Sequence, residues 1–400
     1  MPEGWEWQKL GDIGTWQSGA TPSRLNKDYY GGDIPWLKTG DLNDDYIYEI
    51  PETITQKALE ETSVKLNPAG SVLIAMYGAT IGKVGILTFP TTTNQACCAC
   101  VDYQGIEKMY LFYFLLSHKE EFIMLGGGGA QPNISKEKIV DTFIPIPPLL
   151  EQNRIVNAIE QWFYLIDTLE TAKEDLKTSI EHAKSKILDL AIHGKLVPQD
   201  SNDEPAIELL KRINPKFTPC DNAHYPFDVP HNWVWARGVD IFKPMKAASP
   251  LGDTFKYIDI DAIDNKRNVV TSVKVLNTKQ APSRASRYTE KGCVLFSMVR
   301  PYLRNIAMVT EDDCIASTGF FVCQGKGCLS SKFCYFQMLS NYVVDGLNDF
   351  MKGDNSPSIT KAQIEEYIFP LPPLNEQKRI VTKIEELFAV LDKIQKSIEA

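Results

Sequence analysis

The segment at residues 78–84 has the residue types of a phosphate-binding loop. In such a loop, backbone N–H groups between two glycines hold phosphate, and a Ser or Thr after the lysine binds Mg²⁺. Here Gly78-Ala-Thr-Ile-Gly82 is one residue too short, and Val84 follows Lys83. The glycine run at residues 126–129 follows a helix-like segment instead of a strand, so it is not a dinucleotide-binding motif. The sequence therefore predicts no nucleotide site, and residues 126–129 form either a simple loop or a close backbone approach to a ligand.

Methyl transfer to an amine would need an Asn/Asp-Pro-Pro-Tyr/Phe loop, whose acceptor groups polarise the target nitrogen. The chain has none, because Pro147-Pro148 and Pro372-Pro373 are each followed by leucine. Proline fits just before the first turn of a helix but not in its interior. These pairs therefore mark helix starts, and we predict no catalytic residue.

Cysteine and histidine spacing gives no metal-ligand pattern. The nine cysteines include no Cys-x-x-Cys pair, and the five histidines include no His-Glu-x-x-His pair. We therefore predict no metal, and we expect reduced cysteines that are mostly packed in cores.

Charge is unevenly distributed along the chain. The formal net charge is -9, which argues against a free-standing DNA-binding protein, because phosphate neutralisation normally needs a basic domain. Between Lys279 and Arg304, however, six Lys and Arg residues stand against the single Glu290. The acidic surplus is expected in the helical segments near residues 170–175 and 385–386.

Length and hydropathy favour two globular domains without a membrane span. A chain of 400 residues exceeds what one core usually supports. The N-terminus lacks a basic and then apolar leader, and no apolar run reaches the roughly 20 residues that a membrane span needs. We therefore expect a cytoplasmic protein.

An internal repeat organises the whole chain. Pro2-Glu-Gly-Trp-Glu-Trp returns as Pro230-His-Asn-Trp-Val-Trp, and Gly70-Ser-Val-Leu-Ile-Ala-Met returns as Gly292-Cys-Val-Leu-Phe-Ser-Met. The strongest echo is Pro145-Ile-Pro-Pro-Leu-Leu-Glu-Gln-Asn-Arg-Ile-Val with Pro370-Leu-Pro-Pro-Leu-Asn-Glu-Gln-Lys-Arg-Ile-Val. Each repeat reads as a strand-rich domain followed by a helix, so the sequence predicts an α+β fold with pseudo-twofold symmetry.

Apolar residues after each Pro-Pro pair recur with alternating spacings of four and three. This heptad pattern predicts a seam for another helix. The first helix, about residues 150–191, would be near 60 Å long at about 1.5 Å per residue. A twofold axis between the repeats would make the two helices an antiparallel coiled coil, and any two-domain protein with a coiled-coil dimer seam remains an alternative. The predicted seam residues are Ile155, Ile159, Trp162, Ile166, Leu169, Ile380, Ile384, Leu387, Leu391 and Ile394.

The paired Pro-Pro-Leu-x-Glu-Gln-x-Arg-Ile blocks, each after a domain of about 140 residues, resemble the conserved regions of type I restriction-modification specificity subunits. Gly19-Ala-Thr-Pro-Ser, Asp33-Ile-Pro-Trp and Ile192-His-Gly-Lys-Leu-Val also resemble signatures of that family. The resemblance covers essentially the whole chain. It implies two target-recognition domains at residues 1–144 and 230–368, a central helical region at 145–198, a linker at 199–229 and a shortened helical region at 369–400.

By this resemblance, the chain would bind double-stranded DNA at a bipartite site and perform no chemistry itself. Methyltransferase subunits, two by analogy, and restriction or translocase subunits would be its partners, and S-adenosylmethionine and ATP would bind only to them. Alternatives are a self-sufficient methyltransferase or nuclease and a protein-binding scaffold. The second helix is shorter than the first, which leaves the stoichiometry open.

Residue types in loops that leave strands indicate the DNA contacts. Arg, Lys, Asn and Gln suit phosphates and base edges, and aromatic rings pack on sugars or bases. The candidates in the first domain are Ser23, Arg24, Trp36, Lys38, Thr39, Tyr77, Thr80, Lys83, Asn94, Gln95 and Gln131. Those in the second are Tyr257, Lys279, Gln280, Ser283, Arg284, Arg287, Arg300, Tyr302, Arg304, Ser317, Thr318 and Asn355.

Some of these residues also have a purely structural interpretation. Trp36 is equally a core candidate, and Arg287 could pair with Glu290. The duplication places Arg300-Pro-Tyr-Leu-Arg304 at the position of Gly78 to Gly82, which favours a turn at one surface in both domains. The paired tryptophans of the repeat starts, Trp5, Trp7, Trp233 and Trp235, are predicted to be core anchors.

Overall fold

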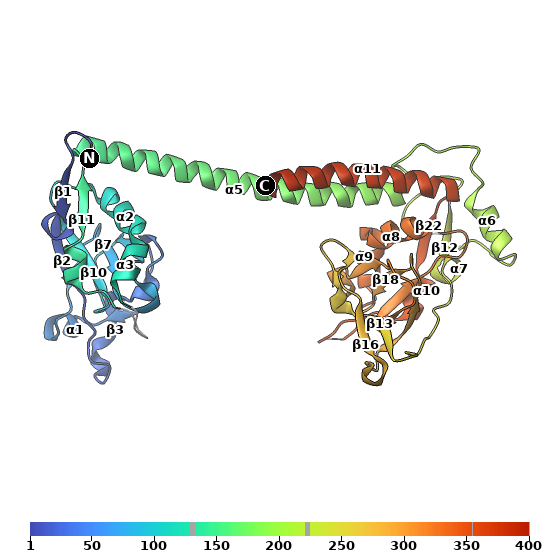
Figure 1. The fold of residues 1–400 in the computed structure, drawn as a ribbon, viewed down its shortest axis with the longest axis horizontal. Coiled ribbons are helices and arrows are strands. Elements are labelled where there is room, and N and C mark those ends of the chain that lie inside the picture. Colours follow the sequence, from blue (N-terminus) through green and yellow to red (C-terminus); the bar gives the residue numbers. More distant parts are fainter. Residues whose placement is uncertain (128–132, 221–224, 354, 400) are drawn as a thin grey trace. The chain divides into compact units, whose positions relative to one another are not determined.

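A computed structural model describes residues 1–127, 133–220, 225–353 and 355–399. The chain divides into two compact units, unit 1 (Met1–Glu170) and unit 2 (Thr171–Ala400). Figure 1 shows a strand-rich globular part in each, and the division falls inside the helix α5 (Leu149–Ile192).

Unit 1 combines two mixed sheets with short helices. Its strands are β1 (Glu6–Lys9), β2 (Gly14–Ser18), β3 (Tyr30–Leu37), β4 (Asp45–Ile47), β5 (Thr53–Ile54), β6 (Leu66–Asn67), β7 (Val72–Ala75), β8 (Val84–Leu87), β9 (Thr91–Thr93), β10 (Cys97–Tyr103) and β11 (Phe143–Ile146). Its helices before α5 are α1 (Gln56–Glu61), α2 (Lys108–Ser117), α3 (Lys119–Leu125) and α4 (Lys136–Val140). One sheet has the strand order β2-β10-β7-β8-β4, another has β5-β3-β9-β6, and β1 pairs with β11.

Unit 2 repeats this plan. Its strands are β12 (Val234–Arg237), β13 (Thr254–Ile258), β14 (Ile263–Asp264), β15 (Val269–Val270), β16 (Lys274–Asn277), β17 (Ala285–Thr289), β18 (Val294–Ser297), β19 (Ile306–Met308), β20 (Cys314–Ser317), β21 (Phe320–Cys323) and β22 (Ile368–Leu371). Its helices besides α5 are α6 (Ala206–Ile213), α7 (Gly238–Ile241), α8 (Ser331–Leu339), α9 (Asn341–Asn348), α10 (Lys361–Glu366) and α11 (Leu374–Glu399). The sheets have the orders β14-β15-β19-β18-β21 and β16-β13-β20-β17, and β12 pairs with β22.

The central strand of each unit is buried on both faces, which explains its continuous apolar sequence. In β7, Val72 and Ile74 lie in the cluster that includes α2, whereas Leu73 and Ala75 lie in a second cluster on the opposite face. Alternate residues of a strand point to opposite faces, so one strand joins two cores. The strand β18 does the same in unit 2.

Strand pairing confirms the duplication and the predicted fold class of two strand-rich domains joined to long helices. The antiparallel trio β10-β7-β8 of unit 1 corresponds to β21-β18-β19 of unit 2. The backbone N–H of Met76 donates to Ala96 O at 2.7 Å, and that of Met298 donates to Gly319 O at 2.8 Å. The carbonyls of these two methionines accept from Ile134 and Ile359 in the same way.

A buried glutamine fastens each conserved helix to its globular part. Gln152 of α5 donates to the carbonyls of Gly105 and Pro147, and its Oε1 accepts from Glu107 N at 2.7 Å. Gln377 of α11 donates to the carbonyls of Cys328 and Pro372 and accepts from Ser330 N at 2.9 Å. Both side chains are fully buried. The Glu-Gln of the repeated block therefore sets where each helix leaves its sheet.

Within unit 2, α11 runs antiparallel to the C-terminal half of α5 (Figure 1). Leu188 and Ala191 share a buried cluster with Ile380. Farther along, Lys184 pairs with Asp392 at 2.5 Å. Rising residue numbers on one helix meet falling numbers on the other, so the two helices are antiparallel, as the twofold relation between the repeats predicts.

The predicted seam residues differ strongly in burial. Ile380 and Ile384 are fully buried, and Ile155, Ile159, Leu387 and Leu391 are half-buried, whereas Ile394 is 41% exposed. Trp162, Ile166 and Leu169 are 67%, 45% and 68% exposed. The helix α11 has 26 residues and α5 has 44, so α11 is too short to pair with the whole of α5. A helix partner for Trp162, Ile166 and Leu169 therefore stays a prediction.

The tryptophan prediction is right for the second repeat and wrong for Trp7. Trp233 and Trp235 are buried, but Trp7 is 54% exposed. The Trp235 ring stacks on Tyr225 at 5.6 Å and meets Phe227 at 4.9 Å, so aromatic residues preceding β12 cover it. Trp7 occupies the same register in its own strand pair, and its side chain is uncovered.

In the described part of the chain, no helix is both long enough and apolar enough to span a membrane.

Candidate nucleic-acid interface

In both units, predicted contact residues gather where two parallel strands end. In unit 1, β3 runs parallel to β9, and Lys38 and Asn94 follow their carboxyl ends. In unit 2, β13 runs parallel to β20, and the predicted contact Thr318 follows β20. Asp259, which the sequence did not select, follows β13. The carboxyl ends of neighbouring parallel strands meet at one edge, which is where open sheets place ligand sites. The duplication therefore provides one such edge per unit.

The edge of unit 1 carries a compact ionic cluster that we call the Glu52 cluster, formed by Arg24, Lys38 and Glu52 beside the ring of Trp36. Arg24 Nη2 lies 3.1 Å from Glu52 Oε2, and Lys38 Nζ donates to Glu52 Oε1. The Arg24 guanidinium carbon lies 5.1 Å from the Trp36 ring centroid and 4.5 Å from that of Tyr30. Arg24, Trp36 and Lys38, which the sequence predicts as DNA contacts, thus meet at one place.

Two aromatic side chains fix the segment that precedes Arg24. Trp36 Nε1 donates to Ala20 O at 3.1 Å, and the Tyr30 hydroxyl donates to Pro22 O at 2.6 Å. The two rings meet edge to face, with centroids 5.9 Å apart. Trp36 is 1% exposed, so its ring belongs to the core. The same ring also lies beneath the cationic groups of Arg24 and Lys38.

Glu52 is a functional candidate that residue-type reasoning from the sequence missed. The hydrogen bond from Lys38, with the one from Arg24, holds the pKa of Glu52 below its ordinary value. An acidic residue just before the short strand β5 gave no signal in the sequence, because both cations come from other segments.

The Gly78–Gly82 and Arg300–Arg304 segments form the same turn, as the duplication predicts. Each contains a 3-10 helix, at Gly78–Thr80 and at Pro301–Leu303. Arg300 and Arg304 adopt φ values of 48° and 54°. The glycines at the equivalent positions, Gly78 and Gly82, have φ values of 65° and 77°.

The two arginines of this turn differ in their contacts. Arg304 is held by the protein, because Nη1 donates to Leu339 O at 2.8 Å and Nη2 donates to Asn341 Oδ1 at 2.6 Å. Arg300 Nη2 donates to the carbonyl of Asn355 at 2.9 Å, and Arg300 is exposed. Of the pair, Arg300 is therefore the better placed for an external ligand.

The edge of unit 2 borders an open cavity of about 510 Å³. Its lining includes Asp259, Asp261, Arg284 and Asn305. Among the predicted contacts, Arg284 lies in this cavity, and its backbone carbonyl accepts from Thr318 N at 2.8 Å. The mixed charge of this lining contrasts with the Glu52 cluster, where two cations share one carboxylate.

Unpaired polar atoms lie at both edges. Thr93 Oγ1 and Asn94 Oδ1 in unit 1, and Tyr257 Oη and Ser317 Oγ in unit 2, have no hydrogen-bond partner among the described residues. Burial raises the pKa of Tyr257. Buried polar groups are normally paired, so these four atoms are exceptions in the packing of the two edges.

The remaining predicted contacts are distributed over both units. Gln95 Oε1 pairs with Thr21, and Lys83 Nζ donates to Leu42 O at 3.4 Å. Tyr77 and Tyr302 are 38% and 46% exposed. Ser23 and Ser283 lie in a loop and a turn, whereas Thr39, Thr80, Lys279 and Gln280 lie in short 3-10 helices. Arg287 lies in β17 with an unpaired Nε in the described structure. Gln131 lies outside the described residues.

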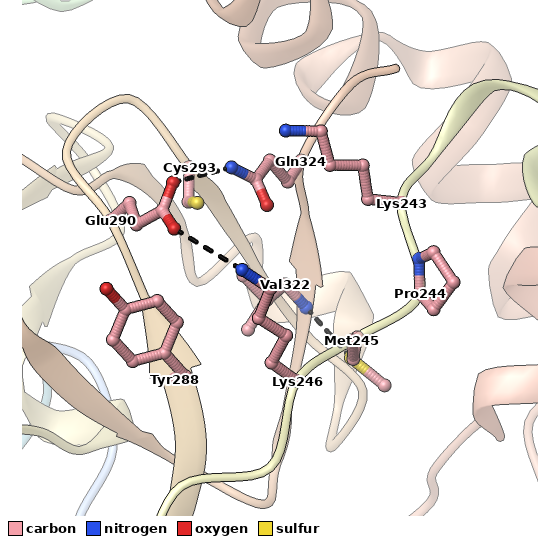
Figure 2. A pocket seen from close by; sticks show the side chains of 9 residues that line it. All are labelled: Lys243, Pro244, Met245, Lys246, Tyr288, Glu290, Cys293, Val322 and Gln324. Atoms are coloured by element: carbon pink, nitrogen blue, oxygen red, sulfur yellow. Dashed lines mark hydrogen bonds and ion pairs between the residues drawn. The ribbon is translucent and has the colours of Figure 1, made fainter.

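Glu290 has partners other than Arg287. Figure 2 shows Gln324 and Lys246 pointing toward its carboxylate, at 2.8 Å and 3.7 Å. The pocket that these side chains line with Tyr288 is only about 10 Å³, which is room for one water molecule. The alternative pairing of Arg287 with Glu290 is therefore not formed in the described structure.

Thiols and carboxylates give no further candidate site in the described residues. The cysteines there are free and buried, and burial raises the pKa of Cys98 to about 12 and that of Cys328 to about 11. A thiol with a raised pKa is a poor nucleophile and a poor metal ligand at neutral pH. Within the described ranges, no cluster of His, Cys, Asp and Glu could hold a metal ion.

Known proteins are similar to this chain along its length. The family model described as "Type I restriction modification DNA specificity domain" matches residues 2–178 and 252–400. The Type I restriction enzyme MjaIX specificity subunit of Methanocaldococcus jannaschii is 24% identical over 415 residues, which cover 100% of this chain and 90% of that protein.

Two solved structures have a similar fold. A chain from a study of assembly and conformational transition of the type I R-M system has a TM-score of 0.63 at 18% identity, and covers 100% of this chain and 94% of its own. The HsdS subunit from Thermoanaerobacter tengcongensis has a TM-score of 0.59 at 18% identity, with 99% of this chain and 92% of that chain covered.

Proposed function

Because the chain belongs to the type I restriction-modification DNA specificity family, we propose that it is a specificity subunit that reads a bipartite DNA sequence. Unit 1 reads one half of the site and unit 2 reads the other. The chain directs partner adenine methyltransferase and restriction subunits to that site.

One observation carries this proposal: the same edge, at the ends of a parallel strand pair, recurs in both units with different side chains. Arg24, Lys38 and Glu52 furnish it in unit 1, and Asp259 and Arg284 furnish it in unit 2. A shared frame with different polar groups suits two half-sites of different sequence, because base edges are read by donor and acceptor patterns.

The chain itself is non-catalytic and needs no cofactor, and S-adenosylmethionine and ATP act on the partner subunits. Two methyltransferase subunits bind one chain, and the assembly works in the cytoplasm. The seam residues Trp162, Ile166 and Leu169, which are exposed in the chain alone, support a further partner surface.

Methylation sequencing tests the proposal directly. A host that expresses this chain with its methyltransferase should acquire adenine methylation at one motif made of two defined halves and an unread gap. Methylation at a continuous motif, or none, would contradict the proposal. Methyl transfer by the purified chain alone would instead favour a self-sufficient enzyme, and absence of DNA affinity with all partners present would favour a scaffold.

A further inference from the structure

We propose that Glu52 is a positioning residue for the first half-site, and that it holds Arg24 ready to contact the guanine of one base pair. This inference rests on the proposed function. It adds a residue that sequence reasoning did not select, and it assigns different tasks to the members of the Glu52 cluster.

The backbone fixes Glu52 before any side chain is considered. Its carbonyl accepts a hydrogen bond from Trp36 N at 2.9 Å, and the next residue, Thr53, pairs with Pro35 in the β3–β5 ladder. The carboxylate therefore starts from a backbone position that is hydrogen-bonded to β3 and lies directly before β5. A positioning group whose backbone is bonded to a sheet is held more precisely than one on an unattached loop.

The carboxylate divides its two oxygens between two cations. Oε2 accepts from Arg24 Nη2 at 3.1 Å, and Oε1 accepts from Lys38 Nζ. Two positive charges against one negative charge leave the cluster with a net charge of about +1, which favours an electron-rich ligand. Glu52 thus orients the cations without neutralising the surface.

Aromatic faces limit the remaining freedom of Arg24. Its guanidinium lies over both Tyr30 and Trp36, and cation–π contacts of this kind favour one orientation of the planar group. The Arg24 side chain still keeps 56% of its surface exposed. A guanidinium held against two rings, with one nitrogen bonded to a carboxylate and more than half of the side chain exposed, can still make a bidentate contact with an external ligand.

Guanine is the base that fits this geometry. In the major groove, O6 and N7 of guanine are two acceptors in a row, which match the fork of an arginine. Adenine offers one acceptor beside a donor, and a guanidinium has no acceptor to meet that donor. Pre-organisation by Glu52 should therefore increase discrimination for guanine more than it increases general affinity for DNA.

The test compares Glu52→Gln with Glu49→Gln in the full chain with its methyltransferase. Both changes remove one negative charge from unit 1, but Glu49 is exposed and has no ion pair among the described residues. The probe is a duplex with the motif that the wild-type complex methylates, together with duplexes altered at each position. Binding is measured by fluorescence anisotropy.

We expect Glu52→Gln to lower discrimination at one G·C position of the first half-site by about tenfold, within the range of one bidentate contact. Discrimination across the second half-site and in Glu49→Gln should stay at the wild-type level. Arg24→Lys, which keeps the charge and loses the fork, should relax the same position.

Failure of the proposed function and failure of this inference give different results. No bipartite motif in the wild type would overturn the proposed function. A bipartite motif whose first half has no G·C pair, wild-type discrimination in Glu52→Gln, or relaxation of different positions by Glu52→Gln and Arg24→Lys would overturn this inference alone. If Glu52→Gln is too unstable for the binding measurement, the Arg24→Lys variant provides the test. Wild-type discrimination by Arg24→Lys at every position of the first half-site would overturn the inference.

Discussion

Two arginines in unit 2 occupy backbone positions that unit 1 fills with glycine. Arg300 and Arg304 have positive φ values, a conformation that strains a side chain with a Cβ atom and often marks a functional site. Arg304 is used by the protein, through Leu339 and Asn341. Arg300 makes one bond to a backbone carbonyl, so its retention in a strained conformation points to an external contact.

Replacing each arginine by glycine should separate strain from function. Arg300→Gly relieves the strain and is expected to raise the free energy of unfolding by up to about 1 kcal/mol, while weakening second half-site binding by about 1 to 3 kcal/mol. Arg304→Gly loses two hydrogen bonds and should lower the free energy of unfolding. Urea denaturation and duplex titration measure both quantities, and equal binding by Arg300→Gly and the wild type would remove this residue from the interface.

At the level of elements, the start of α11 is tied to the preceding parts of unit 2 by a buried carboxylate. Glu376 accepts from Trp233 Nε1 at 3.0 Å and from Gln199 Nε2 at 2.6 Å. Burial raises the pKa of Glu376 above its ordinary value of 4.5. Its equivalent in α5, Glu151, is half-buried and makes no side-chain hydrogen bond among the described residues.

The raised pKa of Glu376 predicts a pH-dependent stability. Because the folded-state pKa lies above the unfolded one, the stability that the protonated group contributes is complete below about pH 4.5 and is lost as the pH rises through the folded-state pKa. The wild-type advantage over Glu376→Gln in the free energy of unfolding should therefore be largest near that lower limit and decrease toward neutral pH. Denaturant titrations across this range, with Glu151→Gln as the matched control, measure it, and an advantage that grows with pH would contradict the prediction.

Across the whole molecule, each unit has its own buried clusters, so the two should unfold as separate cooperative blocks. The clusters of unit 1 contain residues from the first repeat, and the largest cluster of unit 2 contains α6, α8 and α11. Gln152 and Gln377 occupy equivalent positions in the two blocks and are both fully buried.

Removing either glutamine should therefore destabilise one unit only. Gln152→Ala leaves buried backbone groups of unit 1 unpaired and should cost about 1 to 3 kcal/mol there. Gln377→Ala should do the same in unit 2. Calorimetry should resolve two transitions, with a different one lowered in each variant. A single transition lowered equally by both variants would show that the units unfold together.

The internal repeat made the fold predictable from the sequence. The duplicated Pro-Pro-Leu-x-Glu-Gln blocks, the Pro-Pro helix starts and the heptad spacing are local features, and each depends only on neighbouring residues. They correctly predicted α5 and α11, the strand-rich repeats and the equivalence of the Gly78 and Arg300 turns. Burial could not be read in this way for Trp7, because its cover would come from another segment.

The site was determined by the sequence only as a set of residue types. Arg24, Trp36 and Lys38 were selectable because loops rich in cations, amides and aromatic rings suit DNA. Tertiary structure alone decided that Glu52 joins Arg24 to Lys38, that Arg304 is used internally and that both sites lie where parallel strands end. The physical reason is that side-chain partners are set by strand pairing between segments distant in the chain, whereas residue spacing reports only what one helix or strand can do by itself.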